Sequence, residues 1–204
     1  MKSEMEKNEK KIERKDFFRE GPLSLLRAFF EGSKNEETTI QKSSMDGPIL
    51  RPPGAKTEVD FLNLCKGSGL CAEVCPANAI LLLPEESDTS RFTPRIIPSE
   101  SACVLCDDLS CMKSCPTSAL KMTDMHQISI GIAKVEKETC ISWNGKDESC
   151  KACVTSCPVG ENAIKIKSES EKIGPTIAQG CIGCGLCEFY CPVYPKAIQV
   201  FPNE

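Results

Sequence analysis

The sequence is poor in aromatic residues, which make up 5% of its 204 residues, and it contains a single histidine, His126. A large conventional core is therefore not expected, because aromatic side chains supply much of the apolar area that such cores bury. No stretch approaches the ~20 consecutive apolar residues that a membrane-spanning helix needs. The net charge of −4 leaves no basic field for a phosphate backbone, so nucleic-acid binding is not expected.

Motifs for nucleotide binding and for catalysis are also missing. The sequence has no glycine-rich phosphate loop, no nucleophile–base pair and no paired-carboxylate arrangement. We therefore expect no nucleotide cofactor, no flavin and no catalytic site of its own. His126 is interpreted as a lone surface histidine rather than a proton carrier.

Residues 1–48 are expected to form a charged N-terminal extension. Its first residues mix basic and acidic side chains, without the positive region and apolar run that mark an export signal. We therefore expect a cytoplasmic protein whose thiols stay reduced, with a peripheral place on the inner face of the membrane as an alternative. Prolines and glycines from Gly47 to Gly54 indicate an extended linker over residues 33–60.

Within the extension, residues 16–32 contain seven large apolar side chains. Phe18, Leu26 and Phe30 lie near one face of a helix, so an amphipathic helix is predicted there. Such a helix packs on the protein's own body or docks on a redox partner or a membrane surface.

Cysteine is the residue in excess, with 15 copies from Cys65 to Cys191, and most of them follow one repeated pattern. Copy four reads C-x2-C-x2-C-x3-C-P, the pattern of bacterial ferredoxins. Copy two widens its second gap, copy three widens its first gap, and copy one has a serine at its second position. In order, the copies comprise Cys65, Ser68, Cys71 and Cys75; Cys103, Cys106, Cys111 and Cys115; Cys140, Cys150, Cys153 and Cys157; and Cys181, Cys184, Cys187 and Cys191.

Iron–sulfur ligation explains this spacing better than zinc or disulfides do. A cubane cluster presents four irons that each need a thiolate, and cysteines two residues apart let one tight turn reach three of them. In two-cluster ferredoxins, the cysteine before the proline ligates the neighbouring cluster. Zinc ribbons pair two C-x2-C knuckles across a longer loop, and closely spaced cysteines in an odd total are poorly placed for disulfides. All 15 cysteines are therefore predicted to be iron ligands.

Ser68 makes the first site incomplete. A serine oxygen is a poor match for a site that prefers soft thiolates. We therefore expect three [4Fe-4S] clusters and, at the first site, a [3Fe-4S] cluster or a [4Fe-4S] cluster with a labile iron. The alternative is a four-iron cluster completed by serine oxygen or water.

Each Cys-Pro pair leads to a small residue and then to a strand-like run. Strands are predicted at 80–83, 120–122, 164–167 and 198–201, with partner strands at 95–97 and 128–135. Residues 49–204 are thus expected to form an α+β body of tandem bacterial-ferredoxin-like folds, with short strands and helices around the clusters. Trp143 and Tyr190 lie near cysteines and are expected to shield clusters from water.

The segment Leu-Arg-Pro-Pro-Gly-Ala at 50–55, the four motifs and the closing segment at 197–200 resemble the NapG/MauM group of ferredoxin-type proteins. That group is similar to the iron–sulfur (beta) subunits of molybdopterin oxidoreductases. The resemblance implies two ferredoxin-like halves, with copy one paired to copy four and copy two to copy three. The ligand sets it implies are Cys65, Cys71 and Cys191; Cys181, Cys184, Cys187 and Cys75; Cys103, Cys106, Cys111 and Cys157; and Cys140, Cys150, Cys153 and Cys115. Spacing alone also permits consecutive copies to pair.

The sequence thus predicts an electron-transfer subunit that relays single electrons through about four clusters, among protein redox partners in a larger oxidoreductase complex. One alternative is an accessory or maturation protein that supplies electrons or clusters to a reductase. Another is a subunit whose clusters mainly hold the fold, since a chain with few aromatics needs internal staples.

Overall fold

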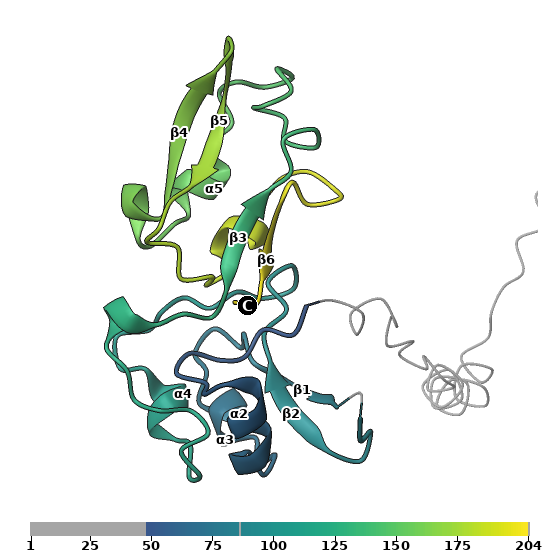
Figure 1. The fold of residues 1–204 in the computed structure, drawn as a ribbon, viewed down its shortest axis with the longest axis vertical. Coiled ribbons are helices and arrows are strands. Elements are labelled where there is room, and N and C mark those ends of the chain that lie inside the picture. The colour runs from purple at the N-terminus through teal and green to yellow at the C-terminus, as the bar shows by residue number, and fades with distance from the viewer. Residues whose placement is uncertain (1–47, 86, 204) are drawn as a thin grey trace, which may run out of the picture. The chain divides into compact units, whose positions relative to one another are not determined.

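The computed structural model describes residues 48–85 and 87–203, apart from the side chain of His126. The helix expected at 16–32 lies outside the described residues, and so does nearly all of the extension at 1–48, so both stay predictions. The described chain consists of short helices and two-stranded sheets (Figure 1), which agrees with a mixed helix and strand protein.

A four-residue helix recurs in every copy of the cysteine motif, with the third cysteine of the copy at its second position. These helices are α3 (Leu70–Glu73), α4 (Ser110–Lys113), α5 (Ala152–Thr155) and α6 (Leu186–Phe189). In each copy the N–H of the fourth cysteine donates to the carbonyl three residues earlier, at 3.2–3.4 Å. The proline that follows has no N–H, so the helical turn ends there.

Left-handed backbone conformations recur around the second motif position. The residue just before this position has φ of 67°, 51° and 70° in copies one, two and four, at Gly67, Leu105 and Gly183. The residue just before the helix has φ of 78°, 49° and 89° in the same copies, at Gly69, Leu109 and Gly185. Copy one therefore keeps the backbone of the complete copies, although a serine has replaced its second cysteine.

Three antiparallel sheets of two strands connect the copies in the described part of the chain. β1 (Leu81–Pro84) pairs with β2 (Phe92–Arg95) between copies one and two. β4 (Ile164–Glu169) pairs with β5 (Lys172–Ile177) between copies three and four. β3 (Ile132–Val135) pairs with β6 (Ile198–Phe201). The first two sheets are hairpins, which turn the chain back from one copy toward the next.

The remaining described helices lie outside the cysteine motifs. They are α2 (Glu58–Leu64) and the short helices η2 (Met125–Gln127) and η3 (Gly160–Asn162). The Thr57 hydroxyl accepts the N–H of Asp60 and caps the start of α2.

Most of the predicted strands are present. The strand at 198–201 is confirmed as β6, the run at 164–167 begins β4, and the run at 80–83 is β1 shifted by one residue. The strand expected at 120–122 is wrong, because Leu120 forms only an isolated bridge to Ala55. Of the two predicted partner strands, the one at 128–135 is a strand only in its last four residues, which form β3. The one at 95–97 is wrong except for Arg95, which is the last residue of β2.

The expectation of an extended linker at 33–60 is wrong for its last part. Leu50 is fully buried and bridges Ile96, and α2 begins inside the segment. Gly54 has φ of 76°, and a Cβ there would lie 2.3 Å from the Lys121 carbonyl oxygen. The glycine and its neighbouring prolines therefore mark a close-packed crossing rather than a free spacer.

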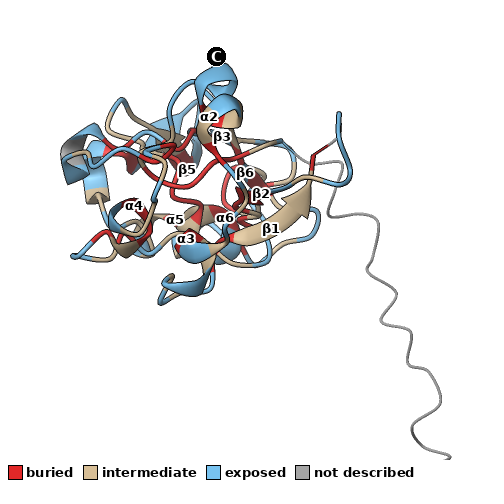
Figure 2. Ribbon diagram, turned by 90° about the horizontal axis from the view of Figure 1, so that it is seen from below, coloured by how far each residue is buried: buried red, intermediate tan, exposed pale blue. Residues whose placement is uncertain are grey.

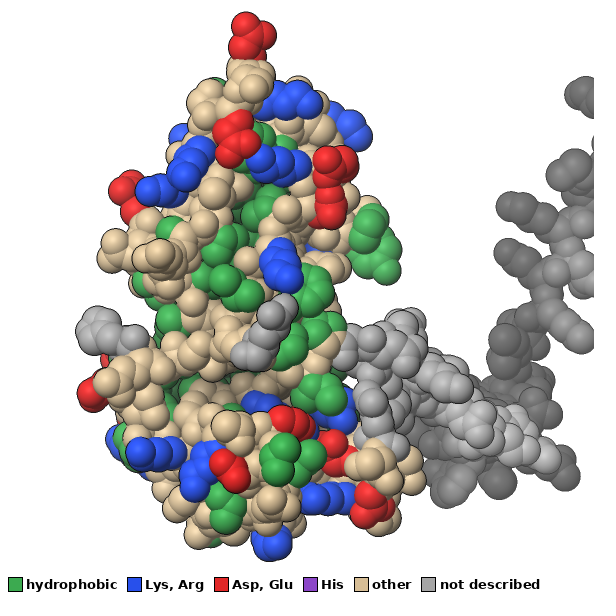
Figure 3. All heavy atoms as spheres, viewed as in Figure 1, with side chains coloured by type: hydrophobic (Ala, Val, Ile, Leu, Met, Phe, Trp, Pro, Cys, Tyr) green, Lys and Arg blue, Asp and Glu red, His purple; other side chains and the backbone are tan. Residues whose placement is uncertain are grey.

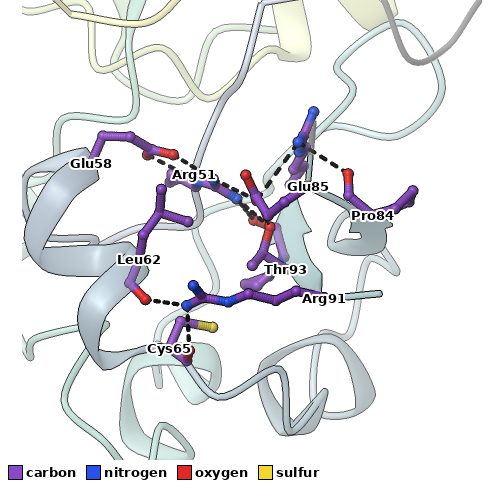
Figure 4. Close-up of polar contacts among 10 residues, drawn as sticks. Arg51, Glu58, Leu62, Cys65, Pro84, Glu85, Arg91 and Thr93 are labelled. Carbon is purple, nitrogen blue, oxygen red and sulfur yellow. Dashed lines mark hydrogen bonds and ion pairs between the residues drawn. The ribbon is translucent and has the colours of Figure 1, made fainter. Parts of the chain in front are cut away.

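The buried Arg51 ties this crossing to the first hairpin (Figure 4). Its guanidinium donates to both carboxylate oxygens of Glu58, to Glu85 at 2.9 Å and to the Thr93 hydroxyl at 2.8 Å. It also lies 4.6 Å from the centroid of the Phe61 ring. Burial raises the pKa of Glu85, but the Thr93 hydroxyl and Arg51 outweigh it and leave that pKa below its ordinary value. Glu85 therefore remains an ionised partner for the arginine.

Cysteines take up much of the interior in place of aromatic residues. Seven of the 15 cysteines are buried, and Phe61 and Trp143 are the buried aromatics of the described residues. Figure 2 shows the buried segments between the helices and strands, with exposed residues around them. The small aromatic content thus corresponds to a core in which cysteine lies among aliphatic side chains.

We expect Gly183→Ala to destabilise the cluster-loaded protein more than Gly145→Ala. Both glycines have positive φ, which costs an alanine about 1–2 kcal/mol. A Cβ on Gly183 would also lie 2.4 Å from the backbone of Gly131, whereas nothing lies within 4 Å of a Cβ on Gly145. Anaerobic thermal unfolding measures both losses. Equal losses in the two variants would contradict the close backbone approach.

Candidate iron–sulfur sites

Three hollows in the described structure are each lined by four cysteines. Site two is lined by Cys75, Cys103, Cys106 and Cys111. Site three is lined by Cys140, Cys150, Cys153 and Cys191. Site four is lined by Cys157, Cys181, Cys184 and Cys187. In each site, three cysteines come from one copy and the fourth is the cysteine before the proline of another copy.

Site one comprises the other three cysteines, Cys65, Cys71 and Cys115. Burial raises the pKa of Cys71 to about 11, and the negative charges of Cys65 and Cys115 raise it further, so the three thiols lie within electrostatic reach of one another. Ser68 stands between Cys65 and Cys71 in the position of the missing cysteine, and it is exposed. Site one therefore has three thiols, and the exposed Ser68 takes the place of the fourth.

The structure contradicts the pairing of copies that the family resemblance implies. Cys191 lines site three rather than site one, and Cys75 lines site two rather than site four. Likewise, Cys157 lines site four, and Cys115 lies beside Cys71. Copy one thus pairs with copy two, and copy three with copy four.

The hairpins between the copies explain this pairing. The β1–β2 hairpin returns the chain from copy one to copy two, so that α3 packs against α4. The β4–β5 hairpin does the same for copies three and four, so that α5 packs against α6. The cysteine before each proline thereby reaches the site of the neighbouring copy.

The arrangement of the thiols fits a cluster better than a single ion or a disulfide. All 15 cysteines are free of disulfides. Within the described residues, no three His, Cys, Asp or Glu side chains come close enough to hold one metal ion. A zinc ion needs its sulfurs about 2.3 Å from one centre. Four cysteines that line a hollow without converging on a point instead suit a larger group with several irons.

Backbone N–H groups point at the cysteines that precede proline in the first two copies. The sulfur of Cys75 accepts the N–H of Ala79, and the sulfur of Cys115 accepts the N–H of Leu120, each at 3.4 Å. In copy one the left-handed Asn78, with φ of 49°, turns the chain back toward the sulfur. Such bonds favour the thiolate and tune the potential of a bound cluster. The small residue that follows each Cys-Pro pair, Ala79 in copy one and Ala119 in copy two, lies at this return of the chain.

Burial raises the pKa of six of these thiols. The values are about 11 for Cys71, Cys103 and Cys184, about 12 for Cys111 and Cys153, and higher still for Cys187. Nearby cysteines contribute to each increase. Cys115 differs: burial also raises its pKa, but the N–H groups of Leu120 and Thr117 and the Thr117 hydroxyl leave it below the ordinary value. Without iron, the six thiols therefore hold their protons near neutral pH.

Trp143 and Tyr190 do not have the shielding role expected of them. Trp143 packs on β5, where its indole N–H donates to the Pro175 carbonyl at 2.8 Å and Gly174 leaves room for the ring. Tyr190 is 55% exposed. Neither side chain lines site two, three or four, and site three is closed instead by aliphatic residues such as Ile141 and Ile198.

These cysteine-lined hollows, each framed by a four-residue helix, define an iron–sulfur protein of the ferredoxin type. The family described as "4Fe-4S dicluster domain" matches residues 64–119, and the one described as "4Fe-4S binding domain" matches residues 181–194. The dicluster match encloses copies one and two, the pair that shares sites one and two. The chain thus contains 4Fe-4S binding domains.

Relatives with known names narrow the class further. The methylamine utilization ferredoxin-type protein MauM of Methylobacillus flagellatus is 37% identical over 76% of this chain and 69% of its own length. The ferredoxin-type protein NapG of Escherichia coli is 32% identical over 79% and 74%. A polyferredoxin-like subunit of the aliphatic sulfonate oxidoreductase of Pyrococcus furiosus is 32% identical over 46% and 49%. The chain belongs to the family of MauM and NapG ferredoxin-type proteins.

Cluster retention should depend on pH. The raised pKa values mean that protons compete with iron for the thiolates, so retention weakens as the pH falls. In the presence of a chelator under anaerobic conditions, the visible absorbance should decline faster at about pH 6 than at about pH 9. Equal rates of decline at both pH values would contradict this competition.

Proposed function

We propose that this chain is an iron–sulfur electron-transfer subunit that relays single electrons within a larger oxidoreductase complex. The observation that supports this most directly is that the described residues form four cysteine sites, which follow one another as neighbours in a single series. The relative from Pyrococcus furiosus is, by its name, a subunit of an oxidoreductase. Bound clusters would supply reversible one-electron oxidation and reduction.

The sites adjoin in the order one, two, four, three. Sites one and two lie at the packed pair of helices α3 and α4, which carry Cys71 of site one and Cys111 of site two. The N–H of Cys103 in site two donates to the carbonyl of Cys184 in site four at 2.9 Å. Sites four and three share α6 and α5, and the charge of Cys153 contributes to the raised pKa of Cys187. Sites one and three are thus the two ends of the series.

This order supports two ferredoxin-like units in tandem, each holding a pair of sites. Sites two, three and four, with four cysteines each, suit [4Fe-4S] clusters. Site one, with three cysteines and an exposed serine, suits a [3Fe-4S] cluster or a four-iron cluster that loses one iron easily.

The chain's surface and its location bear on its partners. On the face drawn in Figure 3, acidic and basic side chains are interspersed, so this face presents no continuous basic patch to a phosphate backbone. No helix among residues 48–85 and 87–203 is long and apolar enough to cross a membrane.

We propose that the amphipathic segment at 16–32 attaches the chain to its complex, at a partner subunit or at the inner face of the membrane. The cytoplasmic location stays a prediction.

Anaerobic purification followed by a redox titration tests the relay function. A relay subunit should co-elute with its partners in fixed stoichiometry, and its clusters should be reduced and reoxidised reversibly. Clusters that do not cycle would show a structural role and contradict the proposal. Reversible clusters in a chain that leaves its partners during purification would favour an accessory protein instead.

Replacing single cysteines tests the assignment of ligands. We expect Cys191→Ala to remove the cluster of site three and to leave site one intact, because Cys191 lines site three. Cys115→Ala should instead remove the cluster of site one. Iron content and low-temperature EPR of the two variants distinguish these losses. Loss of the site-one cluster in Cys191→Ala would restore the pairing of copy one with copy four.

The nature of site one is tested at Ser68. The oxidised protein should show a three-iron EPR signal, since only three cysteines meet at this site. Ser68→Cys should abolish that signal by completing the ligand set, because the backbone there already matches the complete copies. Ser68→Ala, the matched control, should retain it. Four equivalent four-iron clusters in the unaltered protein would contradict this assignment.

A further inference from the structure

A cationic side chain donates to the carbonyl of one cysteine at each end of the series of sites. At site one, the Arg91 guanidinium donates to the Cys65 carbonyl at 2.7 Å and also to the Leu62 carbonyl (Figure 4). At site three, the Lys196 ammonium donates to the Cys191 carbonyl at 2.8 Å and to the Phe189 carbonyl at 3.1 Å. Both cations are partly buried.

The two inner sites differ in this respect. Among the described residues, no lysine or arginine donates to a cysteine carbonyl of site two or site four. Their carbonyls accept neutral donors instead, such as the Ser114 hydroxyl at Cys111 and the Gly160 N–H at Cys157, both at 3.2 Å. In the part of the chain that the structure describes, a cation bound to a cysteine carbonyl is therefore found only at the ends of the series.

The two cations do not arise from the internal repeat. Arg91 comes from the turn of the first hairpin, directly before β2, and reaches back to copy one. Lys196 lies five residues after Cys191 in the loop that leads to β6. Neither forms an ion pair within the described residues. A carboxylate lies within the electrostatic reach of each cation without forming an ion pair with it: local hydrogen bonds and the charge of Arg91 lower the pKa of the exposed Asp88, and burial raises the pKa of Glu188 more strongly than the charge of Lys196 acts to lower it.

We propose that Arg91 and Lys196 tune the end clusters, each raising the reduction potential of the cluster at its own site. This inference rests on the proposed function. Reduction adds one negative charge to a cluster, and a fixed positive charge nearby stabilises that reduced form. Partial burial weakens the screening of this attraction by solvent and salt. An electron is thereby stabilised at sites one and three. These are the end sites of the series, at which redox partners would exchange electrons with the chain.

EPR-monitored redox titration of the full chain tests both residues. Arg91→Gln should shift the midpoint of the site-one signal to lower potential and leave the others in place. Lys196→Gln should do the same for site three, identified by the signal that disappears in Cys191→Ala. Arg91→Lys and Lys196→Arg retain the charge and should stay closer to the parent midpoints.

Lys66→Gln provides the matched control for Arg91. Lys66 adjoins Cys65 in sequence, but it is exposed and its ammonium contacts the Asn63 carbonyl instead. Its removal subtracts the same charge and should shift the site-one midpoint less, because solvent screens an exposed charge. An equal shift in Lys66→Gln and Arg91→Gln would overturn the inference, since net charge and not position would then set the potential.

Unchanged midpoints in Arg91→Gln and Lys196→Gln, with full iron content, would also overturn the inference while leaving the proposed function intact. If Arg91→Gln does not retain its site-one cluster, the result for Lys196→Gln decides: a lower site-three midpoint supports the inference and an unchanged one overturns it. A parent protein whose clusters cannot be reduced would contradict the proposed function itself.

Discussion

The structure depends on an exchange of cysteines between neighbouring copies of one motif. Cys75 of copy one lines site two, and Cys115 of copy two belongs to site one. Copies three and four make the same exchange through Cys157 and Cys191. Neither copy of a pair supplies all the cysteines of its own site. A cluster bound at either site would therefore link the two copies to each other.

This exchange explains how such short elements persist. Helices of four residues are far below the length at which a helix is stable by itself. The described core has few aromatic residues to hold these helices in place. Ligation of buried thiols would supply what hydrophobic packing lacks, and the free energy of cluster binding then becomes part of the free energy of folding.

Local features of this fold could be predicted from the sequence, and non-local ones could not. The cysteine motifs and the strand at 198–201 follow from nearby residues. The pairing of copies does not, because the spacing is the same for either pairing and only the hairpins decide between them. No strand was predicted at β5. This segment contains Pro175, and a proline within a run argues against a strand unless the strand lies at the edge of a sheet.

The segment at 50–55 shows the same limit. Its prolines and glycine suggested a spacer, but Arg51 meets Glu85 and Thr93, which lie 34 and 42 residues further along the chain. Partners so distant in sequence cannot be inferred from composition. The position of Ser68, by contrast, was clear from the motif, and the structure adds that the backbone around it has not changed.

The two ends of the series are chemically distinct. Site one has an exposed serine in place of a thiol and an arginine on a cysteine carbonyl. Site three has four cysteines, an aliphatic surround and a lysine on a cysteine carbonyl. Different ends on one chain would suit the proposed relay between two different partners.

If these thiols hold inorganic clusters, anaerobically prepared protein contains both iron and acid-labile sulfide, and a measurement of the two contents decides the matter. We expect a brown protein with about fifteen irons per chain and a similar number of sulfides. A colourless protein without labile sulfide, or one that holds about one zinc per site, would contradict it.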